Sequence, residues 1–470
     1  MYNHITEDII SNLKKICGVE SVIADDAKKL RRYSHDQIAE KKYSHMPEVV
    51  VKPATTEEII AIIKLANQRK IPVTPRGAGS GLSGGAVPIY GGICLSVERM
   101  NRIIEIDKEN LIAVVEPGVV TNKFDAALKD YGLFFAGYPM SEEFCFVGGN
   151  VGENAGGGKA IKYGVTGKYI TGLEVVTPIG ELVQLGGKRF KDVTGYNLIG
   201  LMIGSEGTLG VFTKIFIRLL PRPVHKVTIL SLFKNIQSAI AIVPIIMTRG
   251  KLIPTAIEFL DGFCLYETCK QLNESIAYRD AGAMLLFEVD GTNEVQVKSD
   301  AVAIQQLCEE YQAIEVYTAE NEEESERFWK IRKQVPWTLK RISPRQSLED
   351  VVVPIAYIPM IIECFHEIGE KYNVLIPCFG HAGDGNLHAT PLKNPGHSDE
   401  RWDNILPEIL ADIYCAAAKV GGTISGEHGI GHKRKGYMDL VMSKVQIEMM
   451  RSIKLALDPN NILNPGKIFD

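Results

Sequence analysis

Three segments dense in glycine restrict the fold of this chain more than any other feature of its sequence. They run over residues 76–88, 148–164 and 204–210, and each lies beside a stretch with the pattern of a β-strand. Glycine lets the backbone adopt positive φ angles and approach another group closely. Flexible surface turns are the alternative, but such turns seldom use glycine so densely. The three segments together predict one extended ligand lying along a surface built mainly from backbone.

The first segment contains a G-x-G-x-x-G motif at Gly79, Gly81 and Gly84. That motif binds a dinucleotide in a Rossmann fold only when its last glycine opens a helix. Here Pro88 and two glycines follow, and the apolar stretch at 93–97 is typical of a strand. We therefore expect a loop whose successive N–H groups form a nest for phosphate without a helix dipole. A flavin dinucleotide spanning the three segments fits this description.

A second constraint is the stretch Gly380–Ala389, whose Asp384-Gly385 pair is a strong signal for a two-residue hairpin loop. That loop would place His381 directly opposite His388. Opposed residues have Cβ atoms about 4.5–5.5 Å apart, so both rings could ligate one metal ion at about 2.0–2.1 Å. A lone histidine is more often a hydrogen-bonded core or surface residue, and the hairpin alone leaves that alternative open.

A third ligand is available in the segment Ser425–Gly431, where Glu427 stands beside His428. Glycines on both sides of this pair permit close backbone approach. An acid next to a further histidine favours a metal site over two unrelated histidines. We therefore expect Glu427 to complete the ligand set.

Composition predicts an ordinary soluble protein of two or three domains. Its 470 residues carry a net charge of −5, so neither nucleic acid nor an anionic membrane is indicated as a partner. The N-terminus lacks the pattern of a signal peptide, and no apolar run is long enough to span a bilayer. Nine scattered cysteines lack the C-x-x-C spacing of metal clusters. We expect a cytoplasmic protein with reduced thiols.

Six motifs stand in order along nearly the whole chain, at Pro75–Gly85, Gly148–Gly156, Gly204–Gly210, Gly380–His388, Ser425–Gly431 and Asp458–Lys467. Together they resemble the flavoproteins of the glycolate oxidase GlcD, D-lactate dehydrogenase and D-2-hydroxyglutarate dehydrogenase group, which have the vanillyl-alcohol oxidase type of fold. The resemblance implies an α+β protein. It implies an FAD-binding domain over residues 1–220, a cap domain with an antiparallel sheet over 221–420, and a segment at 421–470 that returns to the flavin.

The resemblance also implies which residues contact FAD. In this family the first glycine segment contacts the pyrophosphate and the second lies along the isoalloxazine and ribityl chain. The matching positions are Arg76, Gly77, Gly79, Ser80 and Gly81, and then Gly149, Gly152, Asn154, Ala155 and Gly164. Relatives that attach FAD covalently often carry a histidine in the first segment. None occurs between residues 76 and 88, so we expect FAD to be bound non-covalently.

The family's metal ligands match His381, His388 and Glu427, and its catalytic base matches His428. Arg332 matches the arginine that grips the substrate carboxylate, although it could instead be a solvated charge on a helix. Leu348 matches the position where the hydroxyglutarate enzymes place a lysine for a second carboxylate. That departure argues against a dicarboxylate substrate.

The implied reaction is oxidation of a D-2-hydroxy acid, D-lactate before glycolate or D-2-hydroxyglutarate, with hydride transfer to the flavin N5. The divalent ion is Fe²⁺, Zn²⁺ or Mn²⁺, among which the sequence does not choose. The chain most resembles the lactate dehydrogenase subunit of electron-bifurcating complexes, which implies a hetero-oligomer with an electron-transferring flavoprotein. A metal-dependent hydrolase, a purely electron-carrying flavoprotein and a non-redox enzyme of the alkyl-glycerone-phosphate synthase type are the alternatives.

Overall fold

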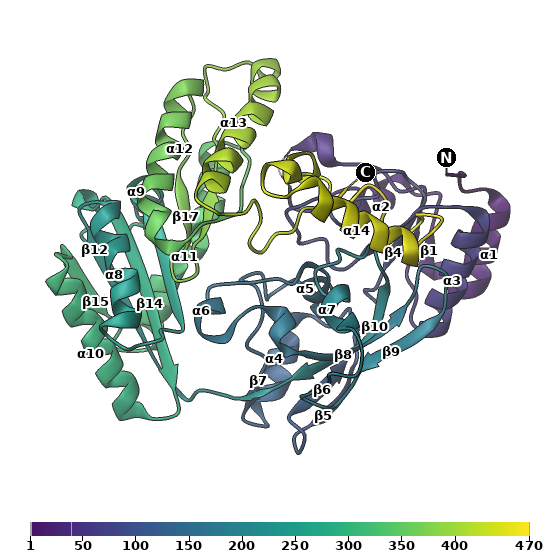
Figure 1. Cartoon of the computed structure of the whole chain (residues 1–470), viewed down its shortest axis with the longest axis horizontal. Coiled ribbons are helices and arrows are strands. Elements are labelled where there is room, and N and C mark those ends of the chain that lie inside the picture. The colour runs from purple at the N-terminus through teal and green to yellow at the C-terminus, as the bar shows by residue number, and fades with distance from the viewer. Residues whose placement is uncertain (1, 39, 470) are drawn as a thin grey trace. The chain divides into compact units, whose positions relative to one another are not determined.

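The computed structural model describes residues 2–38 and 40–469, which form two compact units. Unit 1 comprises Met1–Gly157, Val165–Arg222 and Glu427–Asp470, and unit 2 comprises Gly158–Gly164 and Pro223–Gly426. Met1, Ala39 and Asp470, which fall within the domains expected at 1–220 and 421–470, lie outside the described residues. Figure 1 shows both units, with many of their helices and strands labelled.

The first sheet of unit 1 is built from short apolar strands and one connecting helix. Its order is β1-β2-β4-β3, with β2, β4 and β3 parallel and β1 antiparallel to β2. Thr55 caps the helix between β2 and β3 by accepting the Glu58 N–H at 3.2 Å, as expected, while the Glu58 carboxylate accepts from Ala54. The elements are β1 (Val22–Ile23), β2 (Val49–Val51), β3 (Val73–Arg76), β4 (Ile93–Ser96), α1 (Glu7–Cys17), α2 (Ala27–Leu30) and α3 (Thr56–Arg69).

A second, fully antiparallel sheet of unit 1 has the order β5-β6-β10-β8-β9. The third glycine segment directly precedes β10, the central strand, which places that turn at one end of the sheet. The elements are β5 (Ile103–Asp107), β6 (Ile112–Val115), β8 (Ile170–Val176), β9 (Leu182–Gly186), β10 (Val211–Arg218), the small pair β7 (Leu133–Phe134) and β11 (Leu220–Pro221), and the helices α4 (Thr121–Lys129), α5 (Val147–Glu153) and α7 (Leu198–Met202).

The glycine segments differ in secondary structure. The first has no helix between β3 and β4, which confirms the prediction against a Rossmann site. The second is not simply a loop, because α5 contains three of its glycines. Val147 and Val151 are buried one turn apart, and the Asn150 amide donates to the Thr121 hydroxyl at 2.9 Å. These tertiary contacts outweigh the low helix propensity of glycine.

Unit 2 contains a seven-stranded, fully antiparallel sheet in the order β15-β12-β14-β13-β17-β18-β16. The antiparallel sheet expected for the cap domain is therefore present. Its strands are β12 (His225–Phe233), β13 (Ala256–Asp261), β14 (Ala283–Gly291), β15 (Glu315–Thr318), β16 (Val351–Val352), β17 (Cys378–His381) and β18 (Asn386–Ala389). Its helices are α6 (Ala160–Tyr163), α8 (Ile236–Thr248), α9 (Gly262–Leu272), α10 (Glu294–Glu310), α11 (Glu322–Ile342), α12 (Ile358–Tyr372) and α13 (Asp399–Lys419).

The C-terminal segment of unit 1 begins in a loop and continues through α14 (Lys444–Leu457). Beyond this helix the chain pairs with β3, because Val73 donates its N–H to the Ile462 carbonyl at 2.7 Å and accepts from Asn464 at 2.7 Å. The end of the chain thus returns to the strand that leads into the first glycine segment.

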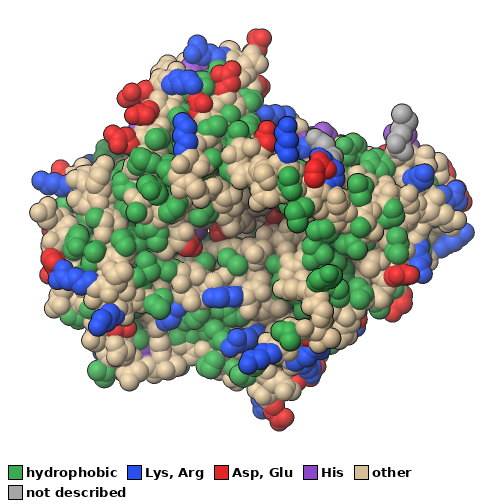
Figure 2. Space-filling model, in the orientation of Figure 1, with side chains coloured by type: hydrophobic (Ala, Val, Ile, Leu, Met, Phe, Trp, Pro, Cys, Tyr) green, Lys and Arg blue, Asp and Glu red, His purple; other side chains and the backbone are tan. Residues whose placement is uncertain are grey.

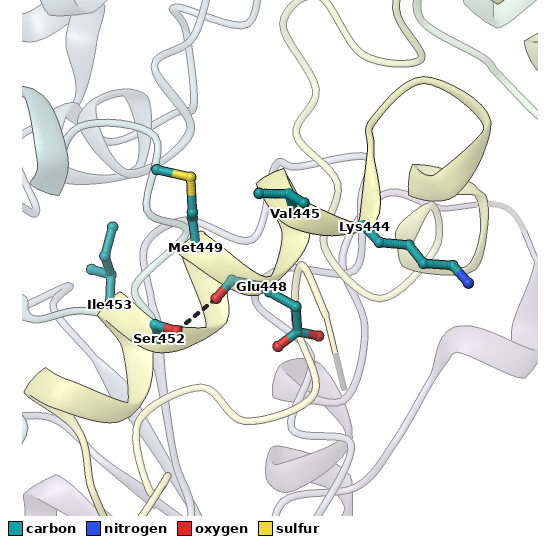
Figure 3. Close-up of a pocket in the computed structure, with 6 residues that line it drawn as sticks. All are labelled: Lys444, Val445, Glu448, Met449, Ser452 and Ile453. Carbon is teal, nitrogen blue, oxygen red and sulfur yellow. Dashed lines mark hydrogen bonds between the residues drawn. The ribbon is translucent and has the colours of Figure 1, made fainter.

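Helix α14 also presents an exposed apolar stripe, formed by Val445, Met449 and Ile453 at four-residue spacing (Figure 3). Elsewhere, the face of the molecule in Figure 2 carries positive and negative side chains interspersed, in keeping with the small net charge. Among the described residues, no helix combines the length and the apolar character needed to cross a membrane.

Candidate active site

The histidine hairpin of unit 2 forms with a register different from the expected one. A four-residue turn, residues 382–385, pairs His381 with Asn386 and Phe379 with His388, so the predicted pairing of the two histidines is wrong by two residues. Gly383 donates its N–H to the carbonyl of Ile257 in β13 at 3.2 Å, and this contact from a distant strand favours the wider turn. Because side chains alternate faces with a period of two, the shift keeps both imidazoles on one face. Their ring centroids lie 5.5 Å apart.

Glu258 joins two of the predicted site residues. It lies in β13 directly opposite His381, whose Nδ1 is 2.6 Å from Oε1 of Glu258. Its other oxygen is 2.6 Å from Nε of Arg332 in α11. All three side chains are buried, at 0–3% exposure, so Arg332 is not a solvated helix charge. The carboxylate accepts the Nδ1 proton of His381, which leaves Nε2 as the atom available to a metal.

Asp350, which directly precedes β16, is a second buried carboxylate at the hairpin. Its oxygens accept from the Asn386 amide at 2.8 Å, the Ser425 hydroxyl at 2.7 Å and the Gly426 N–H at 2.9 Å. The Nδ1 atom of His388 lies 3.9 Å from Asp350 Oδ1, so the pair could also bind one ion. Asp350 thereby attaches the start of the Ser425–Gly431 motif to the hairpin strands.

Glu427 and His428 are the first two residues of the C-terminal part of unit 1. Because Glu427 is bonded to Gly426, its Cα lies about 3.8 Å from that residue, which Asp350 holds in unit 2. Both side chains are largely buried, and His428 Nε2 is 3.8 Å from Glu427 Oε1. The set His381, His388 and Glu427 draws on both units, and as a complete ligand set it stays a prediction.

The expected FAD residues lie in unit 1, except Gly164, which belongs to unit 2. The Arg76 guanidinium donates to the carbonyls of Ala86 at 3.1 Å and His35 at 2.9 Å, so it braces the first glycine segment from within. A Cβ at Gly79 would overlap this guanidinium. Any contact from Arg76 to a cofactor would therefore come from its backbone.

A carboxyl group, of Asp36, and a side-chain amide, of Asn154, bind backbone N–H groups near other predicted cofactor positions. Asp36 accepts the Gly84 N–H at 2.7 Å beside Ser80 and Gly81; burial raises the pKa of its carboxyl, while the N–H groups of Ile38 and Gly84 lower it. Asn154, which directly precedes Ala155, ends α5 at φ +54°, and its side chain accepts the Gly167 N–H at 2.9 Å. The remaining predicted positions are Gly77, Gly149 and Gly152.

Glu258 and Asp350 are two buried carboxylates in contact with predicted site residues or their neighbours, and sequence reasoning assigned neither of them a role. Glu258 lies in an ordinary apolar strand pattern with no local signal, so only its pairing with β17 reveals it. For Asp350 a signal existed, since two adjacent acids, Glu349 and Asp350, stand beside a strand and are both fully buried.

Comparisons with known proteins identify the family and the fold of this chain. Residues 222–468 match the family described as FAD linked oxidases, C-terminal domain, and residues 47–186 match an FAD binding domain. The chain is 40% identical to the glycolate oxidase subunit GlcD of Bacillus subtilis (strain 168), over 99% of this chain and 97% of the relative. It is 36% identical to the D-lactate dehydrogenase of Anaerostipes hadrus, over 99% and 98%. A solved structure of p-cresol methylhydroxylase with substrate bound superposes with a TM-score of 0.81 at 18% identity, covering 100% of this chain and 99% of that one.

Proposed function

Because this chain belongs to the FAD-linked oxidases and has the vanillyl-alcohol-oxidase type of FAD-binding fold, we propose that it oxidises a D-2-hydroxy acid to the 2-oxo acid. D-lactate is the first candidate, supported by the D-lactate dehydrogenase relative, and glycolate is the alternative, supported by the GlcD relative. Leu348 in the place expected for a second-carboxylate lysine favours these monocarboxylates over D-2-hydroxyglutarate.

The buried cluster of Arg332, Glu258 and His381 carries this proposal. A guanidinium that is 3% exposed needs a functional or structural partner, because burying a charge is costly. Glu258 neutralises it from the Nε edge, and the terminal nitrogens of Arg332 are suited to a planar carboxylate. The same carboxylate fixes the orientation of His381. Substrate binding and metal binding are thereby coupled through Glu258.

The residues of α5 fit a flat cofactor. A Cβ placed on Gly149 or Gly152, three residues apart in the helix, would meet no atom within 4 Å. These glycines leave open space along the helix where side chains of other residues would intrude. When bound there, FAD supplies the two-electron acceptor for the C2 hydride.

The predicted donor set fits a divalent ion. Two imidazoles and a carboxylate, from His381, His388 and Glu427, suit Zn²⁺, Fe²⁺ or Mn²⁺. Such an ion lowers the pKa of a bound hydroxyl, as it does for water. His428 accepts the hydroxyl proton at a ring nitrogen, since histidine is the residue type that most often serves as general base near neutral pH.

For the return of the flavin to its oxidised state we propose an electron-transferring flavoprotein as acceptor. The support is the resemblance to the lactate dehydrogenase subunit of electron-bifurcating complexes, together with the absence of a nicotinamide fingerprint in the first glycine segment. The functional form is then a hetero-oligomer.

An anaerobic absorption spectrum of the FAD-loaded protein tests this function. D-lactate, L-lactate, glycolate and D-2-hydroxyglutarate are added to separate samples, and we expect D-lactate to bleach the oxidised-flavin bands. Arg332→Gln should abolish bleaching at the same substrate concentration. Arg327→Gln is the control, because Arg327 lies on the same helix but is partly exposed and pairs with Glu274. Bleaching by glycolate alone would select the alternative substrate, and no bleaching by any of the four acids would overturn the proposal.

A further inference from the structure

Glu206 lies in the third glycine segment, and the proposed function assigns this residue no role. Its backbone N–H donates to the Gly152 carbonyl, in the second segment, at 2.8 Å. Its carbonyl accepts from the side chain of Asn464 at 2.7 Å, and the same amide donates to the Gly85 carbonyl, in the first segment, at 2.9 Å. The backbone of Glu206 therefore links all three glycine segments within unit 1.

The carboxylate of Glu206 binds the turn that follows His428. Oε1 accepts the Ile430 N–H at 2.8 Å and Oε2 accepts the Gly431 N–H at 2.7 Å, and the residue is buried. Gly429, which lies between His428 and Ile430, has φ +83°, and a Cβ there would overlap the carboxyl of Glu153. The turn is thus seated directly on a pair of carboxyl groups and has no room for a side chain at Gly429.

The charge state of the pair agrees with this contact. Burial raises the pKa of both carboxyls, and that of Glu153 is raised further by the charge of Glu206. The N–H groups of Ile430 and Gly431 oppose this rise at Glu206, whereas the charge of Glu206 adds to it at Glu153. Glu206 also has φ +51°, a left-handed conformation that is unfavourable for a non-glycine residue. Strain of this kind is concentrated at functional sites.

We infer that Glu206 is a positioning residue that holds the turn after His428 against the three glycine segments. It thereby sets the place of His428 with respect to the flavin that these segments would bind. This inference rests on the proposed role of His428 as the base.

The test compares two isosteric substitutions in the FAD-loaded protein. Glu206→Gln keeps one oxygen acceptor but turns an NH₂ group toward the second backbone donor. We expect the rate constant of flavin reduction by D-lactate to fall about a hundredfold, as for other small displacements of a reacting group, with FAD content and half-saturating D-lactate unchanged. Hydrogen exchange in the peptide over residues 429–434 should become faster. Glu206→Asp, which keeps the charge but is shorter, should give a smaller loss.

Glu48→Gln is the matched control, because Glu48 also accepts two backbone N–H groups in unit 1, from Ile5 and Gly92. It should change neither the rate constant nor exchange over 429–434. Faster exchange in Glu206→Gln with an unchanged rate constant would overturn the inference, as would loss of FAD at saturating FAD. The variant His428→Ala distinguishes failure of the proposed base from failure of the inference about Glu206. If His428→Ala abolishes flavin reduction while Glu206→Gln leaves flavin reduction unchanged, only the role of Glu206 fails. If D-lactate reduces the flavin of His428→Ala at the parent rate, the role of His428 as base is wrong, and so is the inference that rests on it.

Discussion

Glu258 is the residue on which the candidate site depends most. It lies 123 positions from His381 in sequence, yet it orients that imidazole and neutralises Arg332 with its two oxygens. Carboxylates that accept the second N–H of a metal-binding histidine fix its tautomer and raise its basicity, and their loss commonly weakens metal binding about 10–100-fold.

We therefore expect Glu258→Gln to weaken binding of Zn²⁺ or Mn²⁺ by about 10–100-fold, measured calorimetrically on chelator-treated protein. The same variant should bind D-lactate more weakly, because Arg332 loses the carboxylate contact that fixes the orientation of its side chain. Glu288→Gln is the control, since Glu288 is buried in the neighbouring strand β14 and accepts from Trp329 Nε1 at 3.0 Å. Equal metal affinity in Glu258→Gln and the parent protein would remove Glu258 from the site.

At the scale of elements, the turn between β17 and β18 decides how the histidines are presented. Gly385 closes this turn at φ +84°, and a Cβ there would overlap the carbonyl oxygen of Val353. Gly421 has nearly the same φ, +78°, but a Cβ there would meet no atom within 4 Å. A substitution at Gly421 therefore measures the free-energy cost of the left-handed backbone conformation alone, whereas one at Gly385 adds the cost of the steric overlap with Val353.

Gly421→Ala should therefore lower the free energy of unfolding by about 1–2 kcal/mol, the cost of a left-handed alanine. Gly385→Ala should lower it by about 2–5 kcal/mol, because overpacking adds about 1–3 kcal/mol. Urea denaturation followed by tryptophan fluorescence measures both, since Trp329, Trp337 and Trp402 all lie in unit 2 with the two glycines. Equal losses would mean that the turn relaxes away from Val353.

At the scale of the whole molecule, the chain leaves unit 1 and returns to it, and a buried lysine attaches the returning segment to unit 1. Lys467 donates its Nζ to the Val87 carbonyl at 2.7 Å and to the Asn464 side chain at 3.3 Å. Burial lowers the pKa of Lys467 from 10.5 to about 7, against the opposing carboxylates of Glu206 and Asp36. A neutral amine has the two N–H groups that these two acceptors require.

This shift predicts how the stability of unit 1 depends on pH. Between pH 7 and 10.5 the unfolded chain holds a proton on Lys467 that the folded chain lacks, so the free energy of unfolding rises with pH across this window. The slope from this group is at most about 1.4 kcal/mol per pH unit. Lys467→Met should lose this rise in unfolding followed by circular dichroism. The tryptophan-detected transition of unit 2 is the internal control and should not change. A parent protein without the rise would contradict the prediction.

Local sequence determined the parts of the fold whose cause is local. Strand and helix positions followed from apolar periodicity and from caps such as Thr55. The loop after β3 followed from Pro88 and its neighbouring glycines, which exclude a helix. Because family motifs keep their order and residue types, the sequence was also sufficient to predict an FAD-linked oxidase, as the family comparisons confirm.

Tertiary structure alone decided the features that depend on residues far apart in the chain. The hairpin register depends on the contact of Gly383 with Ile257, and the helix at 147–153 on the packing of valines that surround its glycines. Glu258 and Glu206 acquire their partners only through strand pairing and chain return, across 123 and more than 220 positions. The role of a buried carboxylate depends on the groups that it contacts, and no local sequence pattern specifies a partner at that distance.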